Sequence, residues 1–98
     1  MNTLVRLAKW FHSQCDGDWE HGEGIRIATL DNPGWCVDIT LEGTDLEERP
    51  YQAIEYNRSK QDWIFCLVRD GRFVIRCGPL NLEEGLNQFL NWADPKVY

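Results

Sequence analysis

The sequence predicts an α+β fold in which an antiparallel sheet of about five strands packs against an N-terminal and a C-terminal helix. Apolar residues recur at helical spacing near both ends of the chain, and between these ends they alternate with polar residues in runs separated by turn residues. A parallel sheet would need helices between its strands, and the middle of the chain has no helical pattern. The 98 residues are too few for two domains, so we predict a single domain over residues 1–98.

The first helix is predicted over residues 3–14. Its apolar side chains recur at i, i+3, i+4 and i+7, and we expect this stripe to face the core: Leu4, Leu7, Ala8 and Phe11. Trp10 lies at the edge of the stripe, and Gly17 favours the end of the helix shortly before it.

Two alternating runs then predict a hairpin. "GIRIATL" places Ile25, Ile27 and Thr29 on one face, and "WCVDITLE" does the same for Trp35, Val37, Ile39 and Leu41. Pro33 and Gly34 between the runs favour a type II turn, in which Gly34 has a positive φ.

The next segment predicts a loop, a further strand and the second hairpin. "YQAIEY" is expected to form a strand with Pro50 at its start. "DWIFCLVRDGRFVIRC" predicts two strands joined by a type I′ turn at Asp70 and Gly71.

The chain ends with a predicted helix. Asn81 is its expected N-cap, Glu84 occupies the capping-box position, and Asp94 before Pro95 ends it. Its buried stripe is expected to contain Leu82, Leu86, Phe89 and Ala93, with Leu90 beside it.

The charge distribution favours a basic partner protein. The net charge is −6, and residues 16–55 hold eleven carboxylates against two basic residues, Arg26 and Arg49. Such a field repels nucleic acid and attracts basic proteins, so we predict no nucleic-acid binding. The basic residues around Arg72 are expected to pair with the acidic half of the molecule or to keep strand edges soluble. A solvated face that only maintains solubility is the alternative.

The sequence has features of a cytoplasmic protein. It contains neither an apolar run of 18 residues nor a signal-peptide pattern, so we predict no membrane span. The four cysteines, Cys15, Cys36, Cys66 and Cys77, form no C-x-x-C pair. We expect free, mostly buried thiols.

The stretch "CDGDWEH", residues 15–21, combines a thiol, three carboxylates and an imidazole. A calcium loop of the EF-hand type needs Gly at its sixth position, whereas Gly17 is second, and no spacing here predicts zinc ligands. We therefore predict no metal and no cofactor. Cys15 and His21 could form the centre of a small thiol- or metal-dependent enzyme, but no motif of a known thiol enzyme surrounds them. That enzyme is the alternative to a binding protein.

Three tryptophans each lie next to an acidic residue or a turn: Trp19, Trp35 and Trp63. Aromatic side chains within a charged rim are typical of protein interfaces. We expect Trp63 in the core and Trp19 or Trp35 at least partly exposed.

The run "CDGDWEHGEGIRIATLDNPGW" resembles the signature of the immunity protein 53 family of bacterial polymorphic toxin systems. The likeness continues through "LVRLAKWFHSQ", "DWIFCLVRDGRF" and "LNLEEGLNQFLNW", so it covers nearly the whole chain. It implies a cytoplasmic, non-enzymatic immunity protein that binds a cognate toxin domain stoichiometrically and neutralises it. It supplies no catalytic residue and leaves the toxin's chemistry and the oligomeric state open.

As a hypothesis, the toxin-facing surface combines the acidic turn after the first helix with the tip of the first hairpin. Its candidate residues are Asp16, Asp18, Trp19, Glu20, His21, Asp31, Asn32 and Trp35. The alternative is structural, with Asp16 and Asp18 capping backbone N–H groups.

Overall fold

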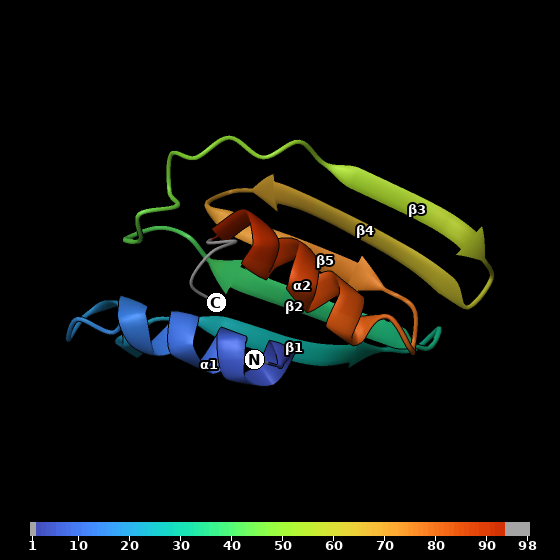
Figure 1. Ribbon diagram of the computed structural model, residues 1–98, viewed down its shortest axis with the longest axis horizontal. Helices are drawn as coiled ribbons and strands as arrows, with labels where there is room; N and C mark the ends of the chain where they lie inside the picture. Colours follow the sequence, from blue (N-terminus) through green and yellow to red (C-terminus); the bar gives the residue numbers. More distant parts are fainter. Residues whose placement is uncertain (1, 94–98) are drawn as a thin grey trace.

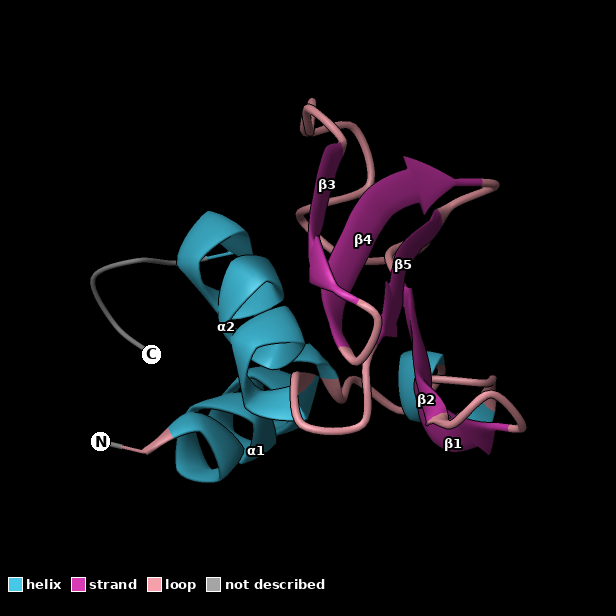
Figure 2. Ribbon diagram, turned by 90° about the vertical axis from the view of Figure 1, so that its right-hand side faces the viewer, coloured by secondary structure: helices cyan, strands magenta, loops and turns pink. Residues whose placement is uncertain are grey.

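Both helices lie on one side of a single five-stranded sheet (Figures 1 and 2). The computed structural model describes residues 2–93. In chain order the elements are α1 (Thr3–Gln14), the short 3-10 helix η1 (Trp19–His21), β1 (Ile25–Leu30), β2 (Gly34–Thr40), β3 (Ile54–Ser59), β4 (Asp62–Arg69), β5 (Arg72–Cys77) and α2 (Leu82–Ala93). The predicted α+β fold is confirmed.

The strands follow the order β1-β2-β5-β4-β3, and every neighbouring pair is antiparallel. The two central strands, β2 and β5, each pair on both sides, so β1 and β3 form the two edges. Alternate side chains of the central strands point toward the helices, as the pleat requires. Val37, Ile39, Phe73 and Ile75 on that side are fully buried.

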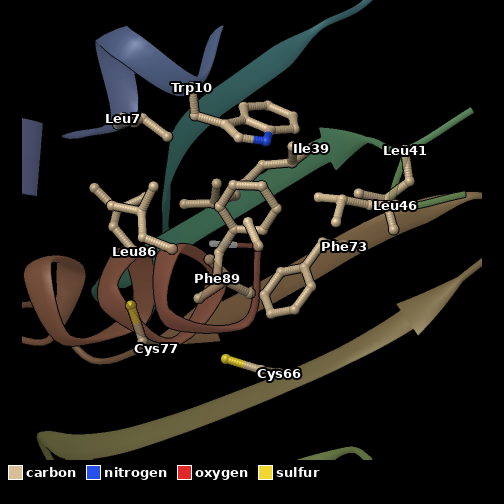
Figure 3. Packing of buried hydrophobic residues seen from close by; sticks show 14 of the residues in the cluster. Leu7, Trp10, Ile39, Leu41, Leu46, Cys66, Phe73, Cys77, Leu86 and Phe89 are labelled. Atoms are coloured by element: carbon tan, nitrogen blue, oxygen red, sulfur yellow. The ribbon is translucent and has the colours of Figure 1, made fainter. Parts of the chain in front are cut away.

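The core lies between the sheet and α2 (Figure 3). Phe89 of α2 packs edge-to-face on Trp10 of α1 at 4.8 Å and on Phe73 of β5 at 5.2 Å between ring centroids. Gly85 lets α2 approach the sheet closely, because a Cβ at this position would lie 2.7 Å from Cγ2 of Ile75. The predicted stripe of α2 is largely confirmed: Leu86, Phe89, Leu90 and Ala93 are buried and Leu82 is half-buried. The predicted end of this helix at Asp94 and Pro95 lies outside the described residues.

The predicted core-facing stripe of α1 is confirmed for Leu7 and wrong for its other three residues, because the helix is rotated. Thr3, Leu7 and Trp10 are buried, whereas Leu4, Ala8 and Phe11 are exposed. Two contacts with α2 fix this rotation. Trp10 packs on Phe89, and the Thr3 hydroxyl lies within hydrogen-bonding distance of Glu83 and Asn87.

One predicted turn is confirmed and the other is wrong. Asp70 and Gly71 have φ values of 53° and 74°, as a type I′ turn requires. Gly34 is not among the residues with positive φ and is instead the first residue of β2. Glycine is needed here because the backbone of β2 passes close to that of β5. A Cβ at this position would lie 2.4 Å from the carbonyl oxygen of Cys77.

Two further expectations are corrected. The strand predicted at "YQAIEY" begins only at Ile54, because Tyr51 turns into the core and packs on Phe73 at 4.7 Å between ring centroids. Trp63 is half-buried and lies on the sheet face away from the helices, so it is not the core residue that we expected.

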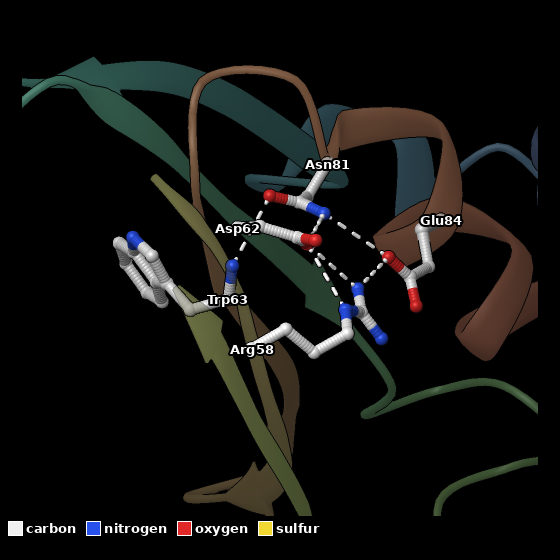
Figure 4. Close-up of polar contacts among 5 residues, drawn as sticks. All are labelled: Arg58, Asp62, Trp63, Asn81 and Glu84. Atoms are coloured by element: carbon white, nitrogen blue, oxygen red, sulfur yellow. Dashed lines mark hydrogen bonds and ion pairs between the residues drawn. The ribbon is translucent and has the colours of Figure 1, made fainter. Parts of the chain in front are cut away.

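A polar network built around the buried Asn81 joins the β3–β4 hairpin to the start of α2 (Figure 4). The Asn81 oxygen accepts from Trp63 N–H, and its amide nitrogen donates to Asp62 at 2.9 Å and to Glu84 at 3.1 Å. Arg58 bonds both of these carboxylates. Its guanidinium and the Asn81 amide lower the pKa of Asp62. Asn81 does precede the helix, since its carbonyl oxygen accepts from Gly85 N–H, but the predicted capping box is wrong. Glu84 accepts from the side-chain amide of Asn81, whereas the Asn81 backbone N–H donates to the carbonyl oxygen of Gly78.

All four cysteines are free, as expected, and Cys66 and Cys77 are buried. Burial raises the pKa of Cys66 to about 12 and that of Cys77 to about 11, so both thiols stay protonated at neutral pH.

Candidate functional site

The segment after α1 is a loop that two of its own carboxylates hold in place. The Asp16 carboxylate accepts hydrogen bonds from the backbone N–H groups of Asp18 at 2.9 Å and Trp19 at 3.0 Å. The Glu20 carboxylate accepts from those of Asp16 at 2.9 Å and Gly17 at 2.8 Å. These N–H groups favour the ionised acids. The bonds from Trp19 and Asp18 lower the pKa of Asp16, and the backbone N–H groups of Glu20, Asp16 and Gly17 lower that of Glu20.

The alternative that these aspartates cap backbone N–H groups is therefore right for Asp16 and not for Asp18. The Asp18 side chain makes no capping hydrogen bond to η1 and is exposed. His21 is also exposed and ends η1.

Trp19 anchors this loop to the core. It is buried between Trp10, at 5.6 Å, and Phe11, at 5.5 Å between ring centroids. Its indole N–H donates to the carbonyl oxygen of Thr40 at 3.3 Å. Trp19 thus ties the loop to the end of β2, and of the two tryptophans expected at the surface only Trp35 is partly exposed.

Two adjoining hollows at this end of the sheet share Thr40 and Glu42. Together they form a surface depression that we call the acidic groove, with five carboxylates and one guanidinium in its lining. The charged lining residues are Asp16, Asp18, Glu23, Glu42, Asp70 and Arg72. Arg72 pairs with Glu23 at 2.6 Å. No ion pair among the described residues involves Asp18, Glu42 or Asp70.

The hairpin tip lies elsewhere. β1 separates it from the loop of residues 15–24 by a strand of six residues, roughly 17 Å long. Asp31 and Asn32 line a separate surface hollow with Lys60 and Trp63. The Trp35 indole N–H donates to the carbonyl oxygen of Pro79 at 3.0 Å, so this side chain braces the loop before α2. The structure thus divides the predicted surface into two parts.

The geometry gives no support to a thiolate at Cys15. Its Sγ lies 3.3 Å from the carbonyl oxygen of Phe11, and burial together with the charges of Glu20 and Asp16 raises its pKa. A nucleophilic cysteine needs the opposite shift. Within residues 2–93, no three His, Cys, Asp or Glu side chains are grouped so that they could hold a metal ion. None of the described helices is long and apolar enough to cross a membrane.

A family model described as immunity protein 53 matches residues 4–94. The chain belongs to the immunity protein 53 family. No curated protein and no solved structure is significantly similar to it. Membership of an immunity family indicates a toxin-neutralising role with a protein toxin as partner, and it favours a protein that is not an enzyme.

Proposed function

We propose that this immunity protein neutralises its cognate toxin in the cytoplasm by stoichiometric association, in which the acidic groove meets basic side chains of the toxin. One observation carries the proposal: Asp18, Glu42 and Asp70 are exposed in the groove and are not used by any ion pair of the described residues. The carboxylates that do form ion pairs are taken by Arg58, Arg72 and Arg76. Unpaired charge at a concave surface keeps its field for an incoming molecule.

The consequence is mainly kinetic. Opposite charges speed the encounter of two proteins, and added salt screens this attraction over about 8–10 Å. A toxin that acts on a polyanion such as nucleic acid needs a basic substrate-binding surface, which an acidic inhibitor would cover. Affinity should then fall with ionic strength through the association rate.

The test compares two double variants with the same change of net charge. Asp18→Lys with Glu42→Lys places two cations in the groove, and Glu48→Lys with Glu55→Lys places them at exposed positions outside it. We expect the groove variant to weaken binding of the toxin domain about tenfold or more, mostly through a slower association rate, and to lose its salt dependence. The control should change binding much less. Equal effects of the two variants on surface-plasmon-resonance rates would show that the groove does not face the toxin.

A further inference from the structure

The two edges of the sheet differ in how they are protected against pairing with another strand. β3 contains an irregularity in its register with β4 between Asn57 and Ser59, and it carries Glu55 and Arg58. Bulges and charges are common means of blocking an edge. β1 pairs with β2 over six residues without a register shift and carries a single charge, Arg26. β1 is therefore the unprotected edge.

The backbone of β1 offers hydrogen-bonding groups to the outside. Thr40 N–H donates to the carbonyl oxygen of Gly24 at 2.8 Å, which fixes the alternation of the antiparallel ladder. Arg26 and Ala28 accordingly point their N–H and C=O groups toward β2. Ile25, Ile27 and Thr29 point theirs outward, where the described sheet has no further strand. These three residues present a row of free donors and acceptors.

Apolar side chains flank this edge on the helix side. Ile27 is 43% exposed, although its side chain points to the helix side of the sheet opposite Val37. α1 lies on the helix side of this edge (Figures 1 and 2) and carries an exposed apolar stripe of Leu4, Ala8 and Phe11. Leu4 also lines a hollow with Leu82 and Leu86 of α2. The Phe11 ring lies 3.8 Å from where a Cβ of Gly24 would be, directly before β1. We call this combination of β1 edge, Ile27 and α1 stripe the β1 shelf.

The charges at the two ends of β1 indicate which kind of strand can bind at the β1 shelf. Glu23, which lines the acidic groove, precedes β1, and Asp31 follows it. If two copies of the chain paired antiparallel about Ile27, Glu23 of each would lie opposite Asp31 of the other. Each copy also carries a net charge of −6. Like charges directly opposite destabilise a strand pair, so a strand with basic residues at its ends fits better.

We propose that the β1 shelf binds a strand of the toxin, which extends the sheet by main-chain hydrogen bonds to Ile25, Ile27 and Thr29. Apolar side chains of the added strand pack between Ile27 and the α1 stripe. Lys or Arg at one end of the strand meets Asp31, and at the other end it shares the exposed Glu23 carboxylate with Arg72. Main-chain bonds supply affinity in this mode of recognition, and alternate side chains supply specificity. The inference rests on the proposed function and names the part of the toxin that binds.

Matched substitutions on the two edges test the inference. Ile27 and Tyr56 are both 43% exposed, both lie on edge strands, and both point to the helix side. A lysine pointing inward at an edge blocks strand addition. With the inactivated toxin domain of the neighbouring reading frame as the probe, Ile27→Lys should weaken binding roughly tenfold or more. Tyr56→Lys should leave it within about twofold.

A backbone substitution separates the main chain from the side chain. Thr29→Pro removes an outward N–H and leaves the ladder to β2 intact, which edge strands tolerate. It should weaken binding, whereas Thr29→Ala should not.

Hydrogen exchange on the wild-type complex does not depend on any variant folding. The amides of Ile25, Ile27 and Thr29 should exchange rapidly in the free protein and become protected in the complex, while those of Arg26 and Ala28 are protected in both.

One outcome would overturn the inference about the β1 shelf and leave the proposed function intact. In it, the groove variant weakens toxin binding, but Ile27→Lys has no effect on binding and the amides of Ile25, Ile27 and Thr29 stay unprotected in the complex. A wild-type protein that does not bind the toxin domain would overturn both. A dimer in solution that Ile27→Lys dissociates would assign the shelf to a second copy and overturn the inference.

Discussion

The Asn81 network and the acidic groove lie at opposite ends of the sheet and use charge in opposite ways. In the network, Asp62 and Glu84 are both bonded by Arg58 and by Asn81. In the groove, Arg72 pairs with Glu23, and the four further carboxylates form no ion pair among the described residues. The first arrangement satisfies its charges within the molecule and joins two parts of the fold. The second leaves charge available to another molecule.

Burial and exposure show which groups in each cluster stabilise the fold. The side chains of Arg58 and Asp62 are 44% and 48% exposed, and exposed ion pairs contribute little stability. The buried Asn81 is the structural centre of the network. In the groove the corresponding structural residue is Trp19, which is buried beneath the carboxylates. Each cluster therefore rests on one buried side chain, and substitutions of these two residues test the comparison most strongly.

The largest effect is expected for Trp19→Ala. The variant leaves a cavity next to Trp10 and Phe11, and the free energy of unfolding should fall by about 3–5 kcal/mol in urea denaturation. Trp19→Phe should recover part of the loss, because the ring is kept while the hydrogen bond to Thr40 is lost. If Trp19→Ala weakened toxin binding at unchanged stability, Trp19 would belong to the interface and the groove would lack its structural anchor.

Asn81→Ala should have the next largest effect. It leaves the backbone N–H of Trp63 without its acceptor and removes two bonds to carboxylates. The free energy of unfolding should fall by about 2 kcal/mol, with toxin affinity of the folded protein unchanged. Arg58→Ala is the control and should cost less, because the ion pairs that it removes are exposed. A larger loss for Arg58→Ala would mean that the ion pairs, rather than Asn81, hold the network together.

Most of the fold could be predicted because its determinants are local. The alternation of β2 and the positive-φ turn at Asp70 and Gly71 follow from short sequence patterns. The rotation of α1 does not. The observed stripe of residues 3, 7 and 10 and the predicted stripe of residues 4, 7, 8 and 11 both have helical spacing, and packing on Phe89 of α2 decides between them. In the sequence Gly34 likewise favours a turn. In the structure it leaves room for the carbonyl oxygen of Cys77, which lies in a strand far along the chain.

The candidate site was predictable only where it is contiguous in sequence. The run Asp16 to Glu20 could be recognised as acidic, and two of its three carboxyl groups bond the backbone of the loop itself. Glu42, Asp70 and Arg72 join the groove through the pairing of β2 with β5, which places Thr40 opposite Arg72. No local sequence pattern predicts that β2 pairs with β5. The tip residues Asp31 and Asn32 belong to the same contiguous run of sequence as the acidic turn, but the length of β1 separates the two in space.

The smallest predicted effect is a difference in thermal stability between alanine variants of Asp16 and Asp18, two residues of the groove. This difference depends on pH. Asp16 accepts two backbone hydrogen bonds that lower its pKa in the folded protein, whereas Asp18 makes no capping bond. A group whose folded pKa is lowered stabilises the protein fully above its unfolded pKa of about 4, and this stabilisation disappears as pH falls through the folded value. Asp16→Ala should therefore lower Tm at pH 7 by roughly 4 °C and have a smaller effect at pH 3. Asp18→Ala should leave Tm within about 1 °C at both values. Equal Tm losses in the two variants, measured by thermal unfolding, would mean that both carboxylates are structural and that the groove has one less charge to offer a toxin.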